Sequence, residues 1–160
     1  MELLEYALFK SYNELNCSVM AAKSDLNKPE LMKEVGFRLG TCLHWLIDVW
    51  ERVESKCIDN SHKSYFSAFR YANNKLKHEV TLVELQQRTG GFSFPIHFPH
   101  VIPAVTIKWV KLDLGESKNK GQHNNYQNLL QGKEIIETVN SAKEIVLVYL
   151  SLHLEQSTIS

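Results

Sequence analysis

Apolar side chains recur every three or four residues along the first half of the chain, a spacing typical of amphipathic helices. One stripe runs from Leu4 to Leu26 and a second from Met32 to Val53. Between them, the segment Asn27-Lys28-Pro29-Glu30 combines a helix stop with a proline suited to the first turn of a new helix. A third stripe, from Tyr65 to Val80, predicts a helix from about Ser61 to the low eighties.

The second stripe is the widest of the three, because Leu43, Ile47 and Trp50 extend it to either side. We therefore expect the helix over residues 32–53 to be the most buried. A fourth periodic segment, from Leu129 to His153, predicts the last helix.

Between Thr89 and Leu112 the period changes to about two, and β-branched and aromatic residues predominate. We predict strands at 92–96 and 105–112, joined by a link that Pro95, Pro99 and Pro103 stiffen. The polar segment 113–125 is expected to be a mobile loop. The fold class is thus mainly α: a single domain over 1–160, an antiparallel four-helix bundle with a β-ribbon insertion at about 89–112, between helices three and four.

Composition narrows the choice of function only slightly. The 160 residues carry 18 Lys plus Arg and 18 Asp plus Glu, so the net charge is zero and attraction to nucleic acid or anionic lipid must rest on a local patch. Cys17, Cys42 and Cys57 lie in apolar-periodic contexts and are expected to be reduced core thiols. No signal peptide or long apolar run is evident, so we expect a cytoplasmic protein without a membrane association.

The third predicted helix carries a local cluster of polar and basic residues near its end. At about 100° per residue, these residues fall within an arc of roughly 140°, centred away from the apolar stripe. They are Arg70, Asn73, Asn74, Lys77 and His78. No acidic residue occurs from Ser61 to His78, whereas Lys63 and Lys75 add further positive charge, so this surface suits phosphate.

The segment Asn73-Asn74-Lys75-Leu76-Lys77-His78, late in the third helix of a predicted bundle, resembles the signature of HEPN domains. That signature is an Arg, often followed by Asn, with a His four to six residues after the Arg. Asn74 and His78 match its Asn and His. Asn73 occupies the place of the Arg, and the nearest arginine, Arg70, lies one helical turn earlier.

The resemblance implies a dimeric helical bundle, paired through helix three, and for many members a metal-independent endoribonuclease of toxin or phage-defence type without a cofactor. His78 would then move the proton of the RNA 2′-hydroxyl, and Arg70 would hold the phosphate, with Asn73 and Asn74 orienting them. DNA, which lacks that hydroxyl, would not be cleaved. Lys63, Lys75 and Lys77 would bind RNA, and Glu51 on helix two would support Arg70 or His78.

Two alternatives remain open. The displaced arginine favours a non-catalytic HEPN-like dimeric module that binds RNA or a protein partner. Alternatively, His78 is a surface residue that caps the last helical turn, and Asn73-Asn74 marks an early helix end. His97 and His100 form a weaker candidate for metal binding that lacks further ligands.

Overall fold

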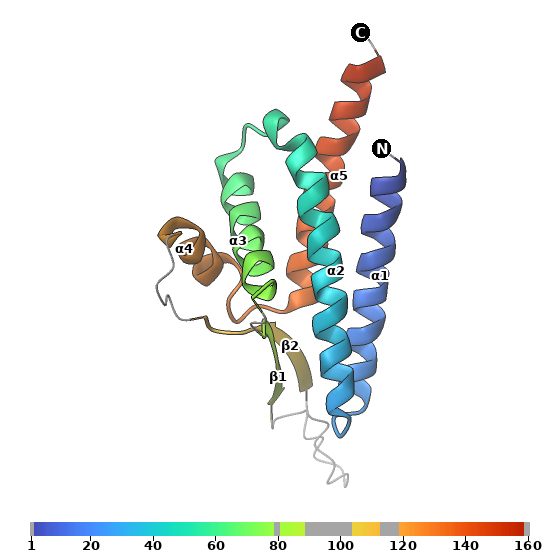
Figure 1. The fold of residues 1–160 in the computed structure, drawn as a ribbon, viewed down its shortest axis with the longest axis vertical. Coiled ribbons are helices and arrows are strands. Elements are labelled where there is room, and N and C mark those ends of the chain that lie inside the picture. The colour runs from blue at the N-terminus through green and yellow to red at the C-terminus, as the bar shows by residue number, and fades with distance from the viewer. Residues whose placement is uncertain (1, 79–80, 89–103, 113–118, 159–160) are drawn as a thin grey trace, which may run out of the picture.

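The computed structural model describes residues 2–78, 81–88, 104–112 and 119–158. Within these ranges the chain is mainly helical, with one small antiparallel sheet (Figure 1). The element order is α1 (Glu2–Ser24), α2 (Pro29–Val53), the 3₁₀ turn η1 (Glu54–Lys56), α3 (Asn60–Leu76), β1 (Val83–Arg88), β2 (Ala104–Trp109), α4 (Lys120–Leu129) and α5 (Ile135–Thr158). None of the helices in the described ranges is sufficiently long and apolar to cross a membrane.

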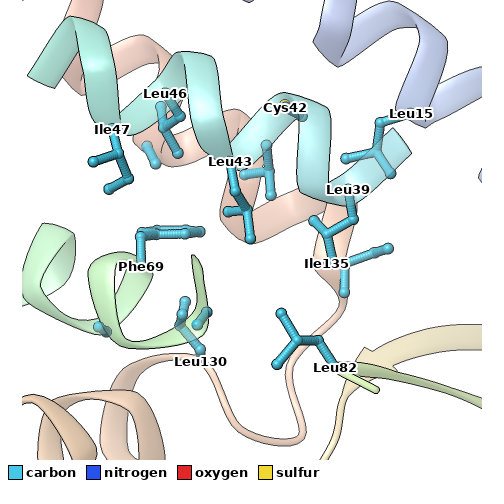
Figure 2. Packing of buried hydrophobic residues seen from close by; sticks show 14 of the residues in the cluster. Leu15, Leu39, Cys42, Leu43, Leu46, Ile47, Phe69, Leu82, Leu130 and Ile135 are labelled. Carbon is cyan, nitrogen blue, oxygen red and sulfur yellow. The ribbon is translucent and has the colours of Figure 1, made fainter. Parts of the chain in front are cut away.

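Helix α2 is the centre of the packing, as its wide apolar stripe predicts. It contacts α1, α3 and α5, while α1 also contacts α5 and α4 packs against α3 (Figure 1). Pro29 occupies the first turn of α2, where its missing N–H costs nothing. The core side chains of α1, α2, α3 and α5 converge between these helices (Figure 2); they include Leu15, Leu39, Leu43, Phe69 and Ile135.

Helix α3 is shorter than its apolar stripe predicts. It ends at Leu76, not in the low eighties, and residues 83–88 form strand β1 instead. Leu82 and Val83 are buried in the same core as the helices, but they reach it from extended backbone that pairs with β2. Tertiary pairing therefore overrides the helical spacing that Val80 continues in the sequence.

Strand β2 lies within the predicted strand 105–112, apart from its first residue, and it pairs antiparallel with β1 in a register that places Val83 opposite Trp109. The predicted strand at 92–96 lies outside the described residues. Lys133 and Gly132 join the end of β2 to the helices, because the Trp109 N–H donates to the Lys133 carbonyl and the Trp109 carbonyl accepts from Gly132. Gly132 has φ of 74°, a conformation that glycine adopts without strain.

The expectation of a loop through residue 125 is wrong for its last part, because residues 120–129 form helix α4. This helix is polar in sequence, and it buries only His123 and Tyr126. Its pattern therefore lacks the apolar stripe from which helices are recognised. Contact with α3, on the side of α3 that faces away from α2, supplies the packing that stabilises it (Figure 1).

The cysteine prediction holds for two residues of three. Cys42 and Cys57 are buried free thiols, and burial raises the pKa of Cys42 to about 12, which makes it unreactive. Cys17 is a free thiol on the exposed face of α1, so its assignment to the core is wrong. Cys17 lies between the buried residues Leu15 and Val19 in the sequence, but two positions from each along the helix, so its side chain is on another face and is exposed.

Two glycines in the middle of α2 give a matched stability test. We expect Gly36→Ala to stabilise the fold by about 0.5–1 kcal/mol, because a methyl group there meets no described atom within 4 Å and alanine favours the helix. Gly40→Ala should gain less, since its Cβ would lie 2.6 Å from Leu76 Cδ2 and would push that side chain aside. Urea denaturation of both variants measures the difference. An equal gain would show that Leu76 moves at no cost.

Candidate functional site

The predicted site residues lie around the C-terminal end of α3. Asp59 begins this helix, accepting a hydrogen bond from the Ser61 N–H at 2.7 Å. The helix ends in a tightened last turn, in which the His78 N–H donates to the Lys75 carbonyl at 3.0 Å. His78 and Lys77 therefore follow the helix directly, and both are exposed.

Two separate cavities flank this end of α3. The first, of about 170 Å³, lies between α3 and the start of α4. It brings together three of the predicted residues, Asn74, Lys75 and His78, with Tyr71, Asn119 and Gln122. Asn119 and Gln122 were not predicted here, because α4, which brings them to the cavity, was not predicted.

Two interactions position the wall of this cavity. The Lys75 Nζ lies 5.4 Å from the centroid of the Tyr71 ring, a cation–π arrangement. The Tyr71 hydroxyl lies 2.8 Å from Nδ1 of His123, a histidine with no exposed surface on α4. The Tyr71 hydroxyl is thus bound to His123 of α4, while the face of the Tyr71 ring contacts the Lys75 ammonium.

The second cavity is a groove of about 570 Å³ between α2 and α3. Asn73 and Lys77 line it with His44 and Gly40 of α2. Asn73 is nearly buried, with 8% of its surface exposed. The predicted arc of polar residues therefore borders two cavities: Asn73 and Lys77 at its α2 edge, and Asn74 and His78 at its α4 edge.

Arg70 is held by two carboxylates, Glu51 from the last turn of α2 and Glu54 from η1. Its Nη1 and Nη2 donate to the two carboxylate oxygens of Glu54 at 3.0 and 2.6 Å. Its Nε lies 3.5 Å from Oε1 of Glu51, the acid that the sequence suggested as a support. The guanidinium is consequently engaged within its own chain, and its paired hydrogen bonds face Glu54 and not an open surface.

The structure does not bring Arg70 and His78 together within one chain. Glu54 precedes α3, so Arg70 points toward the N-terminal half of the helix, while His78 follows its C-terminal end. Lys63 lies in the first turns of α3, farther from His78 than Arg70 is. At a rise of about 1.5 Å per residue, it is about 18 Å from Lys75 along the helix. The cluster around the small cavity is therefore limited to Asn74, Lys75 and His78, with Lys77 beside it.

Sequence reasoning missed three residues that shape this region. Glu54, the first residue of η1, lies one turn after Glu51, and this spacing was a signal that pointed to a second acid near Arg70. Tyr71 and His123 gave no such signal, because their pairing exists only once α4 docks on α3.

The Arg70–Glu54 pair predicts a specific pH dependence. The Arg70 guanidinium holds the pKa of Glu54 below its ordinary value of 4.5, chiefly through the hydrogen bonds. The folded state then binds this proton less tightly than the unfolded chain, so the pair stabilises the fold above about pH 4.5, and this contribution is lost as pH falls through the folded pKa. We expect Arg70→Met to lose about 1 kcal/mol at pH 7, a modest value for a partly exposed pair, and almost nothing near pH 2.

Urea denaturation between pH 7 and pH 2 measures this difference. Arg52→Met is the matched control, because Arg52 contacts Asp48 at 3.4 Å and is more exposed. Its loss at pH 7 should be smaller. A loss in Arg70→Met that stays constant down to pH 2 would contradict the assignment.

Comparison of this chain with protein-family models, with curated proteins and with solved structures gave no match.

Proposed function

We propose that this protein binds single-stranded RNA without cleaving it, at the surface formed by the C-terminal end of α3. The observation that carries the proposal is that Lys75, Lys77 and His78 lie at one helix end, in a segment free of acidic residues from Ser61 to His78, with Lys75 and His78 beside a small cavity. Lysine side chains at a surface attract the phosphate backbone even when the whole molecule is neutral.

The engagement of Arg70 is the reason to favour binding over cleavage. A nuclease that stabilises charge on a scissile phosphate needs a cationic donor aimed at it. Arg70 instead donates two hydrogen bonds to Glu54 and forms an ion pair with Glu51, both of which precede α3. The endoribonuclease hypothesis, with His78 as acid and base, is therefore the less supported of the two.

The resemblance to HEPN domains belongs to the same proposal. It implies that α1, α2, α3 and α5 serve as the four helices of such a bundle, that two copies pair through α3, and that the protein acts in the cytoplasm. Pairing would place a second basic helix end near the first, which would lengthen the surface available to RNA.

Charge reversal tests the RNA-binding proposal. We expect Lys75→Glu/Lys77→Glu to weaken binding of a fluorescent single-stranded RNA by at least about tenfold at low salt, measured by anisotropy. The slope of log K against log salt should fall by about 1.4, since each phosphate contact on a single strand contributes about 0.7.

The matched control is Lys10→Glu/Lys33→Glu on the exposed faces of α1 and α2, which changes the net charge equally. It should leave affinity within about threefold. Equal losses in both double variants would mean that net charge alone drives binding and would overturn the proposal. In EDTA, cleavage of the RNA by wild type that disappears in His78→Ala would replace binding with the nuclease hypothesis.

A further inference from the structure

We propose that the cavity between the end of α3 and the start of α4 holds a terminal phosphate monoester of RNA. The inference rests on the proposed function and names the group that this part of the surface recognises. Among the residues that the structure describes, six line the cavity: Tyr71, Asn74, Lys75, His78, Asn119 and Gln122.

The size of the cavity selects a small group. At about 170 Å³ it is smaller than the roughly 300–1,000 Å³ of pockets that enclose drug-sized ligands. A single tetrahedral anion is of a size that such a volume accommodates. The groove between α2 and α3, at about 570 Å³, is more than three times larger, so it does not match a single phosphate group in size.

The lining of the cavity provides positive charge and hydrogen-bond donors. Lys75 contributes an ammonium group, which lies over the Tyr71 ring at 5.4 Å from its centroid. The amides of Asn74 and Gln122 and the imidazole of His78 add donors, and none of the six lining residues is acidic. The first turn of α4, which begins at Lys120, also lies here, and the N-terminal end of its dipole favours an anion.

A chain end suits this cavity better than an internal phosphate. An internal phosphodiester carries one negative charge and has a nucleotide on each side, whereas a terminal monoester carries about 1.5 to 2 charges near pH 7 and is free on one side. The doubly charged end is attracted more strongly to Lys75, and only one nucleotide is attached to it.

The test compares one short RNA sequence with a 5′-phosphate, with a 3′-phosphate, or with hydroxyl groups at both ends. We expect one phosphorylated form to bind wild type at least about tenfold more tightly than the hydroxyl form. Lys75→Met and His78→Ala should each reduce this preference to about twofold or less. Lys77→Met, which alters the groove on the other side of α3, should weaken all three RNAs equally and keep the preference.

A second measurement does not depend on RNA. Inorganic phosphate, added at constant ionic strength, should shift the backbone amide signals of Asn74, Lys75 and Gln122 in NMR spectra of wild type and not of Lys75→Met. Thermal unfolding followed by circular dichroism confirms that each variant is folded.

The outcomes separate the two proposals. Equal binding of phosphorylated and hydroxyl-ended RNA overturns the terminal-phosphate site and leaves RNA binding intact. Phosphate-induced shifts without binding of any RNA overturn the proposed function and retain an anion site at the cavity. Absence of both responses overturns both proposals.

Discussion

Trp109→Ala should lower the free energy of unfolding by about 3–5 kcal/mol, the range for removing a large aromatic side chain from a packed core. Trp109 lies on β2 and has no exposed surface. Its ring meets Phe69 of α3 and Tyr126 of α4 edge to face, at 5.9 and 6.2 Å between centroids. Its indole Nε1 donates to Thr138 Oγ1 of α5 at 2.8 Å. One side chain thus joins the sheet to three helices, and its loss leaves a cavity that no single element can fill.

Urea denaturation followed by circular dichroism measures this loss. Trp45→Ala is the matched control: Trp45 is only half-buried on α2, so it should cost clearly less. Thr138→Val removes the indole's acceptor while it preserves the ring contacts, and it should cost about 1 kcal/mol. Similar losses for Trp109→Ala and Trp45→Ala would mean that the sheet is not held to the helices in this way.

Tyr71→Phe should cost about 1–3 kcal/mol although it removes a single oxygen atom. Within the described part of the structure, His123 Nδ1 meets only the Tyr71 hydroxyl, and the buried Nε2 has no hydrogen-bond partner there. Removal of the hydroxyl leaves both ring nitrogens buried without a partner. The variant loses stability because the imidazole is desolvated without a hydrogen-bond partner. Water cannot replace the hydroxyl, since His123 has no exposed surface.

A double-mutant cycle isolates this pair. Tyr71→Phe/His123→Leu replaces both partners with apolar groups, so it should be less destabilising than Tyr71→Phe alone. Tyr149→Phe is the control, because its hydroxyl contacts His62 at 3.1 Å, and His62 is partly exposed and has access to water. A loss for Tyr149→Phe as large as that for Tyr71→Phe would show that burial of His123 is not the cause.

The same pair connects stability with the proposed site. Tyr71→Phe keeps the ring beneath Lys75, so the cation–π contact at 5.4 Å is retained. We therefore expect Tyr71→Phe to change the free energy of binding a terminal phosphate less than it changes the free energy of unfolding. Tyr71 and His123 would act as positioning residues, whereas Lys75 and His78 face the ligand.

The sequence alone determined the long helices of this protein. The stripes through α1, α2 and α5 have the spacing of one buried helical face, and Pro29 marks where α2 begins. Their side chains pack against one another, so periodicity along the chain suffices to identify them. The residue types along the chain also indicated two further features. One is the polar cluster at the end of α3, and the other is the segment that contains β2.

Only the tertiary structure decided where α3 ends and what surrounds its last turn. Leu82 and Val83 continue an apolar pattern that fits a helix or a strand, and pairing with β2 selects the strand. Helix α4 has too few apolar residues to be recognised, and contact with α3 stabilises it. The sequence suggests that Arg70 binds phosphate, but in the fold its guanidinium is paired with Glu54. In each case the deciding partner is distant along the chain or on another element, and packing in three dimensions brings it into contact.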